Sequence, residues 1–166
     1  MMNVRNLAGG MALSLLGSVA CAQGTFSCTN VRVPNGLVTD CAGQPVGGPN
    51  YRMEVRVSNP RTQAFDAGVL QVTTTTNQPL GHVTIFSGKN AGRFSAGTLL
   101  VPFLPPGTDA TVELRAWDRT TGETFDAATI RGASVAKVRL GGAGQPPSMP
   151  GVITQFSGVR LCPVKP

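Results

Sequence analysis

Hydrophobic and polar residues alternate along several short stretches of the chain. Residues 51–57 place a tyrosine, a methionine and two valines on one side and two arginines and a glutamate on the other. Residues 112–117 and 135–140 alternate in the same way. A period of two residues is that of a β-strand with one buried and one solvated face. The pattern therefore predicts half-buried strands at these three places.

Other runs of β-branched and apolar residues have the length of strands and are separated by groups rich in Pro, Gly and Asn, which favour turns. These runs cover residues 25–33, 69–76, 82–86, 98–103 and 156–162. No helical period stands out. We therefore expect an all-β fold, an antiparallel β-sandwich that is Ig-like or related, with about seven to nine short strands. The glycine- and proline-rich residues 141–150 should cross the end of the sandwich as a loop.

Residues 1–22 have the layout of a secretory signal peptide. Arg5 precedes an apolar run, and Ala20-Cys21-Ala22 fits the pattern of a cleavage site. The run is shorter than the roughly 20 residues of a membrane span, and no span is expected elsewhere. We expect cleavage near Ala22 and a single sandwich domain over residues 23–166, either secreted or located at the cell surface or in the periplasm.

Lipidation of Cys21 is an alternative fate of the leader. Val19-Ala20-Cys21 resembles part of a bacterial lipobox, although Ser18 stands where that motif prefers Leu. The sequence favours cleavage at Ala22 over lipidation.

Three cysteines follow the leader, Cys28, Cys41 and Cys162. An oxidising compartment favours pairing two of them, and sequence alone leaves the pairing open. Cys28 with Cys41 is slightly favoured because the two are close in the chain, and Cys28 with Cys162 is the other pairing considered. With a single histidine in the chain, a structural disulfide is favoured over a metal site or an activated thiol. No metal and no cofactor are expected.

The charge balance is basic, with 14 Lys and Arg against 8 Asp and Glu and a formal net charge of +6. The basic residues are scattered, without a basic run or interleaved aromatics, so nucleic-acid binding is not expected. A basic protein can associate weakly with anionic surfaces. The partners we consider are extracellular polysaccharide and another envelope protein.

Half of the acidic residues and the only tryptophan lie in residues 113–126, "ELRAWDRTTGETFD". We expect a strand, a turn near residues 119–122 and a return strand, with Arg115 and Asp126 as a cross-strand ion pair. Glycosidase chemistry needs two carboxylates, one of them with a raised pKa. Neighbouring arginines favour structural charges over catalysis. Calcium is also disfavoured, because the loop pattern of a calcium site is missing.

Trp117 and Phe125 are the weak candidates for ligand binding. Together they could stack on a sugar ring, although packing in the core or at its rim is favoured. His82 stands alone near a turn, and the chain lacks the G-x-S-x-G motif of a serine hydrolase.

Several landmarks occur together in the second half of the chain. A Pro-Gly turn leads into "TVELRAW", a Thr-Phe pair follows, and "RLGG" and "PPSMP" come later. In this order they resemble a family of exported bacterial β-sandwich domains of uncharacterised function that often carry a PEP-CTERM sorting anchor. This chain ends in "LCPVKP" without such an anchor, so anchoring by that route is not expected. The resemblance implies a secreted all-β module and identifies no site residues.

These features favour a non-enzymatic, secreted or cell-envelope module with a structural or interaction role and an unknown ligand. The alternative is a carbohydrate-binding or adhesive module that uses the Trp117 hairpin. A small hydrolase is the least favoured class.

Overall fold

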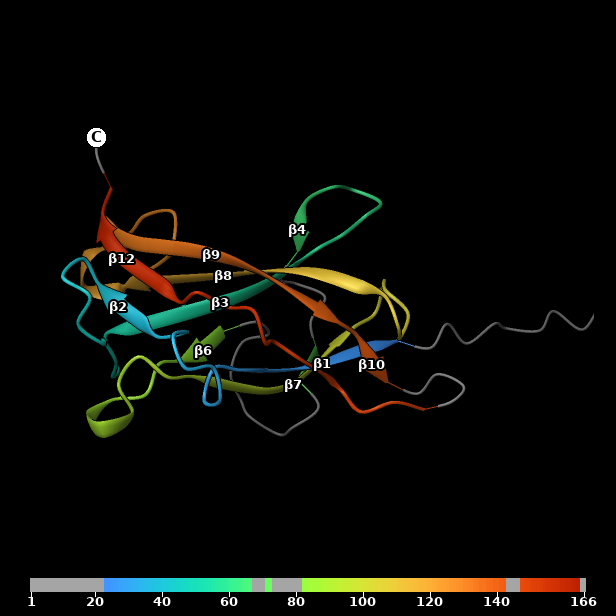
Figure 1. Cartoon of the computed structure of the whole chain (residues 1–166). Helices are drawn as coiled ribbons and strands as arrows, with labels where there is room; N and C mark the ends of the chain where they lie inside the picture. The colour runs from blue at the N-terminus through green and yellow to red at the C-terminus, as the bar shows by residue number, and fades with distance from the viewer. Residues whose placement is uncertain (1–22, 67–70, 73–81, 143–146, 165–166) are drawn as a thin grey trace, which may run out of the picture.

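The computed structural model describes residues 23–66, 71–72, 82–142 and 147–164. The predicted signal peptide and Cys21 lie outside these residues. Two β-sheets pack against each other (Figure 1). The helical elements among the described residues are two single 3-10 turns, η1 (Gly88–Asn90) and η2 (Arg119–Thr121). None of the described helices has the length and apolar character needed to cross a membrane.

The larger sheet carries the predicted strand at residues 51–57 in its interior. Its order is β2 (Val38–Asp40), β12 (Val159–Pro163), β9 (Ile130–Arg139), β8 (Asp109–Asp118), β3 (Tyr51–Ser58) and β4 (Phe65–Asp66). A further strand, β6 (His82–Thr84), also pairs with β3.

The smaller sheet has the order β10 (Gly141–Gly142), β1 (Gly24–Thr29), β7 (Ser95–Val101) and β5 (Gln71–Val72). The short β11 (Gly151–Val152) pairs with β1. Residues 141–150 were expected to form a loop, but Gly142 pairs with Ser148 and the segment begins as a strand.

The all-β sandwich is confirmed, and two details of the prediction are wrong. The described residues contain twelve strands, more than the seven to nine predicted. The prediction was too low because strands of two or three residues are too short to show a period of two. The sheets are also not purely antiparallel, since β11 runs parallel to β1 and β2 runs parallel to β12. Of the run predicted at residues 69–76, only β5 lies within the described residues.

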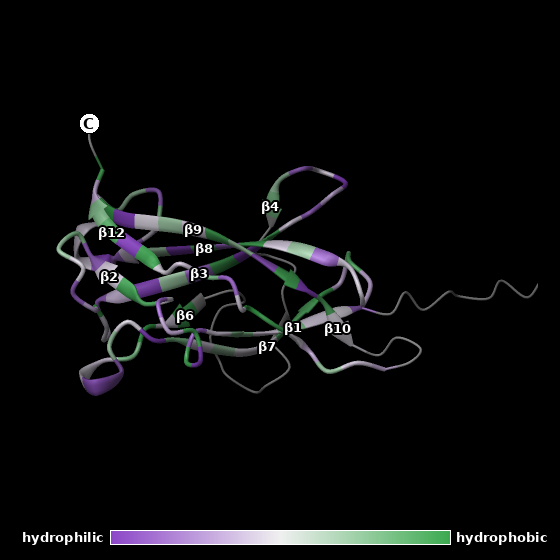
Figure 2. Ribbon diagram, in the orientation of Figure 1, coloured by the Kyte–Doolittle hydropathy of each residue, from purple (hydrophilic) through white to green (hydrophobic). Residues whose placement is uncertain are grey.

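The core lies between the sheets and is apolar. Strands β3 and β8 pair so that Val55 faces Leu114 and Val57 faces Val112, all fully buried. Phe26 of β1 and Leu99 of β7, also fully buried, belong to the same core. Hydrophilic and hydrophobic positions alternate along β3 and β12 (Figure 2).

Asn30 is the one buried polar or charged side chain recorded among the described residues. Its Nδ2 donates to the carbonyls of Gly36 and Gly92, and its Oδ1 accepts from the Phe94 amide at 2.7 Å. These bonds satisfy the buried amide. They tie the turn after β1 to the segment that leads into β7.

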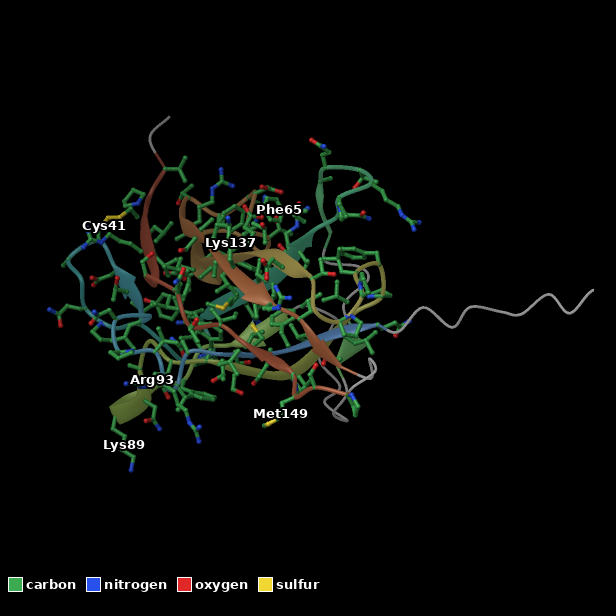
Figure 3. The ribbon with its side chains drawn as sticks, turned by 45° about the vertical axis from the view of Figure 1, so that its right-hand side comes forward. Cys41, Phe65, Lys89, Arg93, Lys137 and Met149 are labelled. Atoms are coloured by element: carbon green, nitrogen blue, oxygen red, sulfur yellow. A yellow bond between two sulfur atoms is a disulfide. The ribbon has the colours of Figure 1, made fainter. Side chains whose placement is uncertain are left out.

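The disulfide joins Cys41 to Cys162, with their Cα atoms 5.0 Å apart (Figure 3). Both pairings considered from the sequence are therefore wrong, and Cys28 is the unpaired thiol among the described residues. The reason is the parallel pairing of β2 and β12, which sets Asp40 beside Leu161 and so brings together the residues that follow them in the chain, Cys41 and Cys162. Cys28 instead points into the core from β1, and burial raises the pKa of its thiol to about 12.

Candidate functional site

The predicted hairpin has a longer turn than expected. Strand β8 ends at Asp118 and the return strand β9 begins at Ile130, so residues 119–129 form the connection. The cross-strand neighbour of Arg115 is Ala133, and Asp126 lies in the connection. The predicted Arg115–Asp126 cross-strand pair is therefore wrong.

Side-chain hydrogen bonds shape this connection. The Asp118 carboxylate accepts from the Thr120 amide at 2.9 Å, which starts η2 instead of a two-residue turn. Thr121 Oγ1 then donates to the Asp118 carbonyl at 2.8 Å and accepts from the Ile130 amide at 3.2 Å. One threonine thus closes both ends of the connection.

The connection folds back closely on itself. A Cβ atom added at Gly122 would lie 2.4 Å from the Ala128 nitrogen, so only glycine fits there. Phe125 packs edge-on against Trp117 with ring centroids 6.3 Å apart. Trp117 is only 2% exposed, and the two candidate aromatics therefore form a small packed unit outside the main core. The ring of Trp117 offers no face to solvent.

Phe125 is half-buried and lies in contact with two guanidinium groups. The Cζ atoms of Arg115 and Arg131 lie 4.8 and 5.1 Å from its ring centroid. Arg131 also donates to the Phe125 carbonyl at 2.7 Å. Such cation–π contacts stabilise a ring and orient the cations. This stacking was not predicted, because the charge pattern pointed only to ion pairs.

The acidic residues of this segment all have partners. Glu113 binds Arg115 at 2.8 Å and lies 3.7 Å from Arg56. Glu123 pairs with Arg119 at 2.9 Å, and Asp126 lies 3.7 Å from Arg131, whereas Asp118 caps η2. A carboxylic acid that donates a proton near neutral pH typically lies in an apolar pocket, and none of these four carboxylates has that setting.

Strand alternation gathers basic side chains on the solvent side of the larger sheet. We call this side of β12, β9, β8 and β3 the outer face. Its seven basic residues are Arg52, Arg56, Arg115, Arg131, Lys137, Arg139 and Arg160. Its three strand carboxylates are Glu54, Asp109 and Glu113. Bases scattered in sequence thus become one face with an excess of positive charge.

Three outer-face cations, Arg52, Lys137 and Arg160, have no ion pair within the described part of the chain. Lys137 and Arg160 are exposed and Arg52 is half-buried. In Figure 3, Lys137 lies over β9, and Lys89 reaches into solvent from η1 on another side of the molecule. Cations without internal partners are the ones most available to an anionic ligand.

A groove of about 610 Å³ opens where β6 borders β3. We call it the Phe86 groove, and its lining includes Pro49, Arg52, Thr84, Phe86, Ser87 and Asn90. The groove was not predicted from the sequence, although the alternation of residues 83–86 indicated it. Val83 and Ile85 are buried, so the same alternation leaves Phe86 outside, where it is 39% exposed.

A second hollow, of about 440 Å³, lies between the turn after β1 and β12 and is lined by Asn35, Thr39 and Arg160, among others. The residues that the structure describes contain no group of three or more His, Cys, Asp or Glu side chains able to hold a metal. The backbone of His82 pairs with Glu54 at the start of β6, and its side chain lies outside the described part.

No protein-family model, curated protein or solved structure matches this chain. The resemblance to exported β-sandwich domains therefore stays an expectation that rests on the sequence landmarks alone.

Proposed function

We propose that the protein is a non-enzymatic module of the cell envelope or the extracellular space that attaches to anionic polysaccharide through its outer face. The proposal includes export by the leader predicted at residues 1–22. A disulfide fits an oxidising compartment of this kind.

The observation that carries the proposal is the charge of the outer face. Seven basic side chains share four neighbouring strands with three carboxylates. A strip of surface with an excess of one charge sign attracts an extended polymer of the opposite sign at many points. A polyuronate, whose sugars each carry a carboxylate, has the matching chemistry.

The alternative of sugar stacking on the Trp117 hairpin has less support. Stacking needs an exposed ring face, and Trp117 is 2% exposed beneath Phe125. The ring of Phe125 is already in contact with the guanidinium groups of Arg115 and Arg131.

The test is binding of polygalacturonate, with uncharged dextran as the control polymer. We expect binding to polygalacturonate alone, weakening as salt rises from about 0.05 M to about 0.3 M because salt screens charges at the surface. Lys137→Glu and Arg160→Glu should each weaken binding by about tenfold.

Arg32→Glu is the matched control, because Arg32 is an exposed arginine in the turn after β1 and does not belong to the four strands of the outer face. It changes the net charge by the same amount and should weaken binding less than about twofold. Equal loss in all three variants would mean that net charge alone attracts the polymer, and would overturn the proposal. Failure of the unmodified protein to bind polygalacturonate would overturn it as well.

A further inference from the structure

We infer that the Phe86 groove is a subsite for one carboxylated sugar unit of the bound chain. The inference rests on the proposed function and places the recognition of a sugar ring at the edge of the outer face. Arg52 belongs to both surfaces, since it points out from β3 and lines the groove. A polymer lying along the outer face would therefore reach the groove without leaving the protein.

The groove is held by backbone contacts. The Phe86 amide donates to the Arg93 carbonyl at 2.8 Å, and the Gly48 amide donates to the Ile85 carbonyl at 3.0 Å. A Cβ atom added at Gly47 would lie 1.7 Å from the Phe86 carbonyl oxygen, so the two segments touch at the backbone. Phe86 is thus exposed from a fixed position, and binding there needs little ordering of the chain.

The lining has the chemistry of a sugar site. Phe86 and Pro49 supply apolar surface for the C–H face of a pyranose ring. Thr84, Ser87 and Asn90 are exposed around them and offer hydroxyl and amide groups for the sugar hydroxyls. Apolar surface with a few polar groups around it is the usual lining of a small-ligand site.

The charge of the groove selects an acidic sugar. Among the described residues that line it, Arg52 is the ionisable one and none is a carboxylate. Arg52 also has no ion pair within the described ranges of the chain. A guanidinium fork matches a carboxylate with two parallel hydrogen bonds. The occupant that fits is therefore a uronic acid unit, in preference to a neutral hexose.

The experiment uses trigalacturonate, which is too short to cover the outer face, and maltotriose as its neutral counterpart. NMR titration of the full exported chain should shift amides of residues 47–52 and 84–90 with trigalacturonate and leave them unchanged with maltotriose. Phe86→Ala and Arg52→Gln should each weaken trigalacturonate binding by about tenfold. Arg52→Lys keeps the charge without the fork and should weaken it less.

Phe65→Ala is the matched control, because Phe65 is a half-buried phenylalanine on β4, away from the groove. It should leave trigalacturonate binding unchanged, and thermal unfolding confirms that each variant is folded. Unchanged trigalacturonate binding in Phe86→Ala, with polygalacturonate binding still weakened in Lys137→Glu, would overturn the subsite and leave the proposed function standing. Equal binding of maltotriose would overturn the selection of an acidic sugar. If the unmodified protein bound neither trigalacturonate nor polygalacturonate, both proposals would be overturned.

Discussion

Strands β3 and β8 have two faces built from the same segments of chain and made of opposite chemistry. Toward the smaller sheet they present Val55, Val57 and Leu114, all fully buried. Toward solvent they present Arg56, Glu113 and other charged residues in register. The inner face is a close-packed apolar layer, whereas the outer face is a network of ion pairs, cation–π contacts and unpaired cations.

The difference in chemistry between the two faces assigns stability to one face and binding to the other. Buried apolar groups contribute through removal from water and through packing, and a cavity there is costly. Half-exposed ion pairs contribute little to stability, because water and salt compete for the charges. The inner face should therefore set whether the protein folds, and the outer face should set what it holds.

The largest expected effect comes from truncating the inner face. Leu114→Ala removes a fully buried side chain from the centre of β8 and should lower the free energy of unfolding by about 3 kcal/mol. Val135→Ala is the matched change on the outer face, where Val135 is 54% exposed, and should cost less than about 1 kcal/mol. Urea denaturation measures both. Similar losses would contradict the division between the faces.

The core that the inner face packs into also contains a titratable group, Cys28 of β1, and the next effect depends on pH. Burial raises the pKa of Cys28 from 9.0 to about 12. The folded state therefore keeps a proton that the unfolded state loses above pH about 9, so stability is complete below that pH and falls as pH rises. The loss should reach about 1.4 kcal/mol by pH 10.

Cys28→Ala tests this effect, because it removes the thiol. Urea denaturation across the range from about pH 8 to about pH 10.5 should give a shallower decline for this variant than for the unmodified protein. Tyr51 also has a raised pKa, caused by burial and by Asp118 and Asp40, and it contributes equally to both proteins. Parallel declines would show that the thiol is accessible to water.

The inner face could be predicted from the sequence because its signal is local. Alternation along residues 51–57 gave β3 and its buried side, and the same pattern gave β8 and β9. Strands of two or three residues, such as β10 and β11, are too short for a period to show. The parallel pairs β1–β11 and β2–β12 are set by contacts between distant segments.

The outer face could be predicted only in part, because its chemistry depends on register. The sequence favoured packing of Trp117 over exposure, and Trp117 is buried, but it did not predict the capping of η2 by Asp118 or the contact of Phe125 with Trp117. The Cys41–Cys162 disulfide follows from the β2–β12 pairing in the same way. Local patterns predict which side chains face solvent, and tertiary contacts determine which of these side chains lie next to one another.

The smallest change in the free energy of unfolding should come from the ion pairs of the outer face. Removing an acidic partner there should lower stability and tighten polygalacturonate binding. Glu113→Gln keeps the shape of the side chain and removes the charge that faces Arg115 and Arg56. It should lower the free energy of unfolding by about 0.5–1 kcal/mol. The excess positive charge on the outer face rises at the same time, so polygalacturonate binding should tighten by about two- to threefold.

Glu123→Gln is the matched control, since Glu123 pairs with Arg119 in the connection and its side chain is 77% exposed. It makes the same change in net charge but lies off the strands of the outer face. We expect less than about 0.5 kcal/mol in stability and a smaller gain in binding. Weaker polygalacturonate binding in Glu113→Gln would mean that Glu113 holds Arg115 and Arg56 in the geometry that binds the polymer, so that positioning, rather than excess charge, determines affinity.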